Sequence, residues 1–129
     1  RSTPLYSSAA SDVYKRQSEG KLNKLPKISW KNEYSVCVVL ASKGYPQSYP
    51  KDEIISGFDS ISSNSFVFHA GTKKQDGKIL SNGGRVLGVT ALGKTLQDAI
   101  DNAYASCEKI HWNNKYQRND IGKKGLSNL

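Results

Sequence analysis

The chain has 129 residues, of which 36% are hydrophobic and 23% charged, and its formal net charge is +8 at pH 7. This length suffices for one modest hydrophobic core and excludes a multidomain enzyme with its own cofactor cleft. No apolar run approaches the roughly 20 residues that a membrane-spanning helix needs. We therefore expect one small domain that makes no contact with a membrane.

The two cysteines, Cys37 and Cys107, lie far apart in apolar, periodic segments. Neither has a second cysteine within a few residues, so the sequence lacks the ligand spacing of a zinc site. Buried, reduced thiols are favoured over a disulfide, and such thiols are typical of the cytoplasm.

The positive charge is spread over the segment before the first predicted strand, a predicted hairpin and the C-terminal tail. Nucleic-acid-binding proteins usually gather basic residues on one face and interleave exposed aromatic side chains. Here Phe66 and Phe68 share one face of a predicted strand, where packing in the core accounts for them. We therefore favour a solvated surface over a nucleic-acid interface.

The range 1–17 follows neither a helical nor a strand period. It lacks the apolar core of a signal peptide, and it resembles translated adaptor or vector sequence. Because the chain contains no methionine, we expect a fragment of a longer protein that begins with a non-native, disordered leader. The polar range 18–33, which contains Pro26, is predicted to be a linker or the end of an upstream domain.

The first convincing strand runs from Tyr34 to Ala41. Apolar residues occupy both of its faces, so we predict a central strand. It ends at Gly44-Tyr45-Pro46, where the proline favours an extended backbone at Tyr45. A short strand is predicted around Ile54 and Ile55.

A third strand is predicted from Ser65 to Ala70, followed by a hairpin. Asp76-Gly77 is a strong two-residue turn signal that pairs residues 69–74 with residues 78–80. Asn82-Gly83 offers a second turn, which leads into a strand from Arg85 to Leu92.

On this last strand, Arg85 is expected to share a face with three apolar residues, Leu87, Val89 and Ala91. Gly88 interrupts the opposite face, which suggests a β-bulge or a close backbone approach. The range 88–95 also fits the phosphate-loop pattern G-x-x-x-x-G-K-[ST]. We reject that match, because its middle is apolar strand sequence and the chain lacks a βαβ unit.

One helix is predicted, with Thr95 as its N-cap and Asp98 in its first turn. Apolar residues recur on one face at three- and four-residue steps: Leu96, Ala99, Ile100, Ala103, Cys107 and Ile110. Because this stripe must be buried, the helix is expected to cover one face of the sheet. The expected fold class is α+β, with a small, strongly curved antiparallel β-sheet (half-barrel, hybrid-motif-like) and one covering C-terminal helix.

The segment from Gly83 to Arg85 is the leading candidate for a binding site. Glycines can let backbone N–H groups converge on an anion, and an arginine adds charge and two-point geometry for a phosphate or carboxylate. Alternatively, the glycines make only a tight turn and Arg85 pairs with an acid of its own domain. Both interpretations stay open.

Ser42, Gly44 and Tyr45 form a second candidate rim, although a turn after a strand explains them equally well. For His69, a structural role is favoured over contact with substrate. Arg118 and Asp120 are expected to tie the C-terminal tail to the body of the domain.

Several segments together resemble one known family. In chain order they are Ala41 to Pro46, Phe68 to Thr72, Asn82 to Gly93, Ile110-His111 and Arg118 to Gly122. In this order and spacing they resemble the C-terminal domain of phosphoribosylamine–glycine ligase (glycinamide ribonucleotide synthetase), an ATP-grasp enzyme of purine synthesis. The resemblance covers about Leu22 to Gly122. It departs from the family at residues 115–118, where an aromatic pair usually precedes the arginine.

The resemblance implies that residues 34–122 are this C-terminal domain and that residues 123–129 are a tail. Enzymes of the family use ATP and Mg²⁺ to phosphorylate the carboxylate of glycine. The amine of 5-phosphoribosylamine then attacks the acyl phosphate and gives glycinamide ribonucleotide. ATP and metal are bound by upstream ATP-grasp domains, so this chain is expected to contain no metal site, no complete nucleotide site and no catalytic residue.

The resemblance also suggests the substrate contacts. We expect Gly83, Gly84 and Arg85 to bind the phosphate of phosphoribosylamine, with Ser42 and Tyr45 at the second rim. Two other classes remain possible from the sequence: a stand-alone module that binds an anion or sugar phosphate, and a basic RNA-associated domain.

Overall fold

The computed structural model of this chain describes residues 14–15, 17–21, 23 and 30–127. The chain divides into two compact units, 1–31 and 32–129, and the fold presented is that of the second unit. Most of the predicted leader (1–17) and part of the predicted linker (18–33) lie outside the described residues, so both stay predictions.

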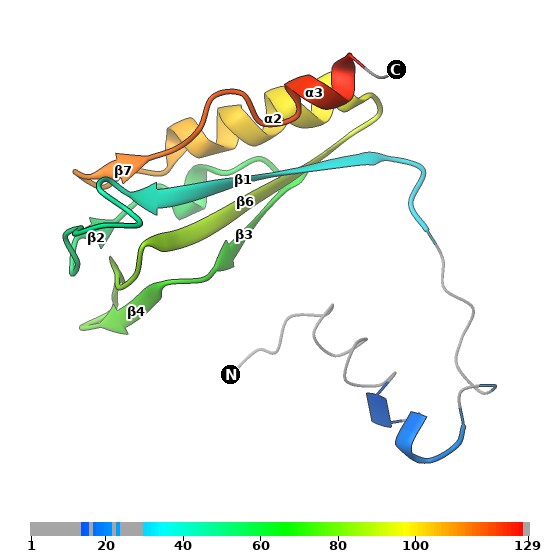
Figure 1. Ribbon diagram of the computed structural model, residues 1–129, viewed down its shortest axis with the longest axis horizontal. Coiled ribbons are helices and arrows are strands. Elements are labelled where there is room, and N and C mark those ends of the chain that lie inside the picture. The colour runs from blue at the N-terminus through cyan, green and yellow to red at the C-terminus, as the bar shows by residue number, and fades with distance from the viewer. Residues whose placement is uncertain (1–13, 16, 22, 24–29, 128–129) are drawn as a thin grey trace. The chain divides into compact units, whose positions relative to one another are not determined.

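The described part of the second unit contains two antiparallel sheets (Figure 1). The larger sheet has the order β3-β6-β1-β7, and the smaller has the order β2-β5-β4. The larger consists of β1 (Tyr34–Ser42), β3 (Ser65–His69), β6 (Arg85–Gly93) and β7 (Lys115–Tyr116). The smaller consists of β2 (Ile54–Ile55), β4 (Thr72–Gln75) and β5 (Lys78–Ser81). The predicted α+β class with antiparallel pairing is confirmed, whereas a single half-barrel sheet is not.

The predicted hairpin forms the smaller sheet. Asp76 and Gly77 have φ values of 50° and 75°, the left-handed geometry that a tight two-residue β-turn requires. The hairpin is shorter than predicted, because His69 ends β3 in the larger sheet instead of beginning β4. The chain therefore crosses from the larger sheet to the smaller after β1 and after β3, and it returns after β2 and after β5.

The main helix, α2 (Leu96–Lys109), begins as predicted with a capping box between Thr95 and Asp98. The Asp98 N–H donates to the Thr95 hydroxyl, and the Thr95 N–H donates to the Asp98 carboxylate, both at 3.1 Å. The helix lies along β1 and β6 (Figure 1). Its apolar stripe is buried against the inner residues of these strands, which confirms the predicted core.

The core consists mainly of residues from one face of the larger sheet and from α2, and Ile55 of β2 and the residues Ile110 and Trp112 after α2 complete it. Its fully buried members include Val38, Leu40, Val89, Ala103 and Ile110. A 3-10 helix, η2 (Phe58–Ser60), and a short helix, α3 (Lys123–Leu126), complete the described elements of this unit. No helix among the described residues is long and apolar enough to cross a membrane.

The opposite face of the larger sheet is exposed. On this face Val39 is 45% exposed and Phe66 is 47% exposed, and Cys37 is also exposed. The predictions that Cys37 is buried and that Phe66 packs in the core are therefore wrong. The reason is that α2 covers one sheet face, and β1 is interior only at its end, where Ala41 and Ser42 pair with β7.

A β-bulge changes the predicted direction of Arg85. Leu87 pairs with Leu40 and Arg85 pairs with Ala41, which leaves Val86 as an extra residue. Val86 and Leu87 are both fully buried, so the alternation reverses and Arg85 is exposed. The prediction that Arg85 shares a face with Leu87 is wrong.

The predicted close backbone approach at Gly88 is instead the approach of a side chain, because a Cβ atom there would lie 3.3 Å from the Cys37 Sγ. The range 88–93 lies within β6 and pairs with both β1 and β3. The rejection of the phosphate-loop match is thereby confirmed.

Candidate functional site

An open cavity of about 590 Å³ lies at the end of the larger sheet where β1 and β3 end and β6 begins. Four of the five predicted site residues line it: Tyr45, Gly83, Gly84 and Arg85. Val39 and Phe68, from the exposed sheet face, line it as well. The sequence therefore predicted the polar side of the cavity and missed its apolar side. Whether Val39 and Phe68 face the cavity or the core depends on which sheet face the helix covers.

The glycine pair is needed for close packing and not for unusual backbone angles. Neither Gly83 nor Gly84 has a positive φ, so neither position requires left-handed backbone geometry. A Cβ on Gly83 would lie 3.1 Å from the Gly71 Cα. A Cβ on Gly84 would overlap the ring of Tyr45, lying 2.7 Å from its Cγ and closer still to two other ring carbons.

Ser42 lies behind the cavity and does not form its rim. Its side chain is fully buried, and its hydroxyl donates to the Gly83 carbonyl at 3.0 Å. The Ser42 N–H donates to the Gly84 carbonyl at 2.8 Å. Ser42 therefore holds both glycines by their carbonyl oxygens, which differs from the predicted direct contact with substrate.

The donors of the candidate site are free among the described residues. The N–H groups of Gly83 and Gly84 donate to no atom of the described part of the chain. Arg85 is exposed, and none of the ion pairs between described residues includes it. The alternative prediction, that Arg85 pairs with an acid of its own domain, is therefore not confirmed among the described residues.

Tyr45 forms one wall of the cavity. It is 41% exposed, and its ring makes an edge contact with Tyr49 at a centroid distance of 6.0 Å. The Tyr45–Pro46 peptide bond is cis, whereas the sequence suggested only an extended backbone before the proline. The wall is thus a tyrosine ring packed over a glycine, beside an arginine that has no acidic partner within the described ranges.

Comparison with protein families gives a match over residues 35–124 to "Phosphoribosylglycinamide synthetase, C domain". The chain belongs to this family. The resemblance found in the sequence is thereby confirmed, and the cavity described above lies within the matched range.

Individual relatives agree with the family. The chain is 45% identical over 124 residues to a phosphoribosylamine–glycine ligase from Synechocystis sp., covering 95% of this chain and 30% of the relative. It is 42% identical to the ligase of the same name from Caldanaerobacter subterraneus, covering 92% of this chain and 28% of that protein.

A solved structure agrees as well. The crystal structure of phosphoribosylamine–glycine ligase from Thermotoga maritima matches with a TM-score of 0.59 and 38% identity, over 67% of this chain and 21% of that one. The chain therefore spans less than a third of the length of these relatives.

Elsewhere in this C domain, His69 has a structural environment. Its Nδ1 lies 3.0 Å from the Thr72 hydroxyl, and its ring stacks at a tilt on Phe58 at 5.5 Å. This agrees with the favoured prediction of a structural histidine.

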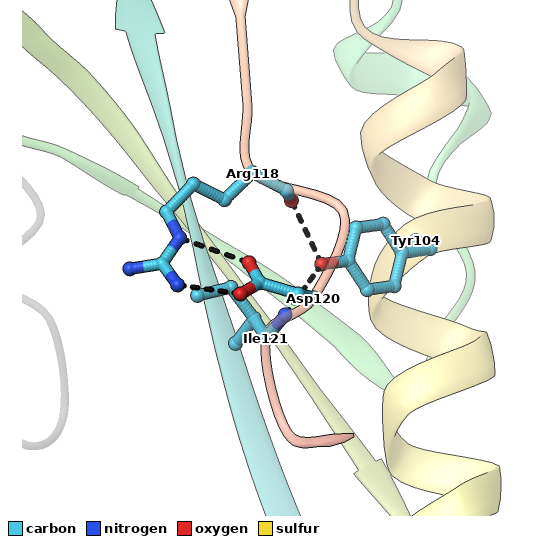
Figure 2. Close-up of polar contacts among 4 residues, drawn as sticks. All are labelled: Tyr104, Arg118, Asp120 and Ile121. Atoms are coloured by element: carbon cyan, nitrogen blue, oxygen red, sulfur yellow. Dashed lines mark hydrogen bonds and ion pairs between the residues drawn. The ribbon is translucent and has the colours of Figure 1, made fainter. Parts of the chain in front are cut away.

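The tail of the C domain is attached differently from the prediction (Figure 2). Arg118 and Asp120 pair with one another through two hydrogen bonds of 2.9 Å and 2.6 Å, and both are exposed. The hydrogen bonds from Arg118 lower the pKa of Asp120 below its usual value. Because the pair is local, it does not tie the tail to the body.

Tyr104 makes the attachment instead. Its hydroxyl projects from α2, donates to the Arg118 carbonyl at 2.8 Å and accepts from the Ile121 N–H at 3.1 Å (Figure 2). Tyr104 is half-buried beside the apolar stripe of α2, and its partners lie in a segment without periodicity, so the sequence did not indicate this attachment.

The sequence also gave no sign of the contacts of Lys115. Its Nζ donates to the carbonyls of Cys107 and Ile110, both at 2.8 Å, and so satisfies acceptors at the C-terminal end of α2. Burial lowers the pKa of Lys115. Burial also raises the pKa of the Cys107 thiol to about 11, and Cys107 is buried and reduced, as predicted.

The described residues do not gather ligands for a metal ion. No three side chains of histidine, cysteine, aspartate or glutamate come together within the described ranges.

Proposed function

We propose that this chain is the C-terminal part of an ATP-dependent phosphoribosylamine–glycine ligase of the cytoplasm. The complete enzyme would join glycine to 5-phosphoribosylamine and give glycinamide ribonucleotide, a step of purine biosynthesis. The observation that carries this proposal is the family match over residues 35–124, together with 45% identity to a ligase over nearly the whole chain.

In this proposal the cavity receives the phosphate of 5-phosphoribosylamine. The Arg85 guanidinium supplies positive charge and a two-point geometry that suits a phosphate. The free N–H groups of Gly83 and Gly84 supply additional donors from a backbone that Ser42 holds in place. The ring of Tyr45 forms the neighbouring wall.

The contribution of this domain is therefore substrate positioning and charge, without proton transfer. None of the lining side chains combines a nucleophile with a base. Fixed donors that orient a phosphorylated substrate lower the barrier by holding the reacting amine in place.

The proposal assigns ATP and Mg²⁺ to the parts of the parent enzyme outside this domain. The described residues do not fit a metal, because they contain no cluster of three metal-ligating side chains. The partners of the domain are thus the upstream ATP-grasp domains, glycine and phosphoribosylamine.

The test is steady-state kinetics on the full-length ligase that carries this domain. We expect Arg85→Ala to raise the KM for phosphoribosylamine about 10- to 100-fold, the usual effect of losing a charged hydrogen bond. The KM values for ATP and glycine should change little. Lys74→Ala, which removes an exposed positive charge from β4, is the matched control.

Equal effects of the two variants on the KM for phosphoribosylamine would refute the role of Arg85. A stand-alone module that binds sugar phosphates is the alternative, and the same cavity favours it. It predicts measurable binding of ribose 5-phosphate to the 129-residue chain by calorimetry, whereas the ligase proposal predicts weak or no binding without the remaining domains.

A further inference from the structure

Asn82 lines the cavity that contains Arg85, and its side-chain amide is unused within the described part of the chain. The residue is exposed and directly precedes the glycine pair. Its side chain forms no hydrogen bond with any described residue. Because an amide carries two donor hydrogens and one acceptor oxygen, it can both donate to and accept from a ligand in the cavity.

The backbone around Asn82 is held in place from two sides. The Asn82 N–H donates to the Gly71 carbonyl at 2.7 Å. The Ser42 hydroxyl donates to the carbonyl of the next residue, Gly83, at 3.0 Å. Asn82 therefore presents its amide from a fixed backbone, which reduces the entropy lost when a ligand binds.

The cavity is larger than a phosphate group requires, and part of its lining is apolar. Its volume of about 590 Å³ is in the range of pockets that enclose a whole small molecule. Val39, Ala70 and the ring of Tyr45 line it besides the polar residues. A pentose has a matching character, because C–H groups form the faces of its ring and hydroxyl groups project from its edge. A pentose that carries a phosphate therefore suits this lining better than a free phosphate does.

We propose that Asn82 binds the 2- and 3-hydroxyl groups of 5-phosphoribosylamine and thereby selects ribose over 2-deoxyribose. This inference rests on the proposed function, because it places the phosphate of the same substrate at Arg85. Two neighbouring hydroxyl groups can receive a hydrogen bond from the amide nitrogen and donate one to the amide oxygen. With C5 held through its phosphate and C2 and C3 held by Asn82, the amine on C1 stays free to attack the acyl phosphate.

Steady-state kinetics of the full-length ligase with two amine substrates tests the proposal. 5-Phosphoribosylamine forms from ribose 5-phosphate and ammonia, and 2-deoxyribose 5-phosphate gives the analogue that lacks the 2-hydroxyl group. We expect the unmodified enzyme to prefer the ribose compound about 10- to 100-fold in kcat/KM, because the analogue leaves the amide unpaired. In Asn82→Ala this preference should disappear.

Asn64→Ala is the matched control. Asn64 is exposed and does not line the cavity, and its side chain has no hydrogen-bond partner among the described residues. We expect this variant to keep the preference and neither variant to change the midpoint of thermal unfolding. Competitive inhibition by ribose 5-phosphate and by 2-deoxyribose 5-phosphate gives the same comparison without the chemical step.

The proposal is overturned if the unmodified ligase shows no preference, if Asn82→Ala keeps it in full, or if Asn64→Ala loses it as well. A preference that survives Asn82→Ala, together with a raised KM for Arg85→Ala, would refute the hydroxyl contact and leave the phosphate site standing. A preference lost in Asn82→Ala, with an unchanged KM for Arg85→Ala, would refute the phosphate site and leave the hydroxyl contact standing.

Discussion

The ring of Tyr45 occupies the space that a side chain at position 84 would need. A Cβ added to Gly84 would lie 2.7 Å from the Tyr45 Cγ, well inside van der Waals contact. Because Gly84 is also buried, the backbone cannot move away easily. The absence of a side chain at residue 84 and the position of the ring at residue 45 therefore depend on one another.

This relationship predicts a strong coupling between the two positions. Gly84→Ala should lower the free energy of unfolding by about 1–3 kcal/mol, the usual cost of overpacking. In the double variant with Tyr45→Ala the added methyl group has room. The loss of unfolding free energy in the double variant should therefore be smaller than the sum of the losses in the two single variants. Urea unfolding of the four proteins measures the coupling, and strictly additive costs would contradict the observed packing.

Ser42 is predicted to stabilise the glycine pair through its buried hydroxyl. Ser42→Ala removes the 3.0 Å bond to the Gly83 carbonyl and should lower the free energy of unfolding by about 1–2 kcal/mol. Ser127→Ala removes an exposed bond of the same type to the Lys123 carbonyl and should have no measurable effect. If both substitutions are neutral, Ser42 does not hold the glycine pair as we infer.

Tyr104 is predicted to control the attachment of the C-terminal tail. Tyr104→Phe removes the acceptor of the Ile121 N–H, so this amide should exchange with deuterium clearly faster than in the unmodified protein. Arg118→Ala is the control, because it removes only the exposed pair with Asp120. Faster exchange of Ile121 in the arginine variant, but not in the phenylalanine variant, would show that the ion pair holds the tail.

The buried thiol of Cys107 predicts a loss of stability in alkali. Its pKa rises from 9.0 to about 11 in the folded protein, so the folded state retains a proton that the unfolded state releases. The contribution is fully present below pH 9 and is lost as the pH rises toward 11.

Urea unfolding from pH 8 to 10.5 gives the measurement. The unmodified chain should lose about 2 kcal/mol more over this range than Cys107→Ala, which cannot titrate there. Other groups titrate in the same range, and comparing the two proteins removes their contribution. Parallel pH curves would mean that Cys107 is accessible to solvent.

Features that depend on a few neighbouring residues could be predicted from the sequence. Thr95 and Asp98 cap α2, and the apolar stripe of that helix follows the three- and four-residue period that burial against a sheet requires. The turn at Asp76-Gly77 needs two residues that tolerate left-handed angles, and it forms where they occur. The family was evident for the same reason, since its motifs are short and keep their order.

Other features were decided by contacts between distant segments. Ser42 bonds to a carbonyl 41 residues away, and the bulge at Val86 reverses the direction of Arg85. Apolar residues occupy both faces of β1, a pattern typical of a strand that is covered on both sides, so the exposure of Cys37 and Val39 could not be inferred locally.

By itself the sequence determined the helix, the tight turn, the family and the residues of the glycine–arginine segment, because local backbone preferences and motif order need no knowledge of the rest of the chain. Only the tertiary structure decided which sheet face is buried and how Tyr45, Ser42 and Arg85 are arranged around the glycines. The physical reason is that one helix can cover one face of this sheet, and the side chains left on the other face take their surroundings from segments far away in the chain.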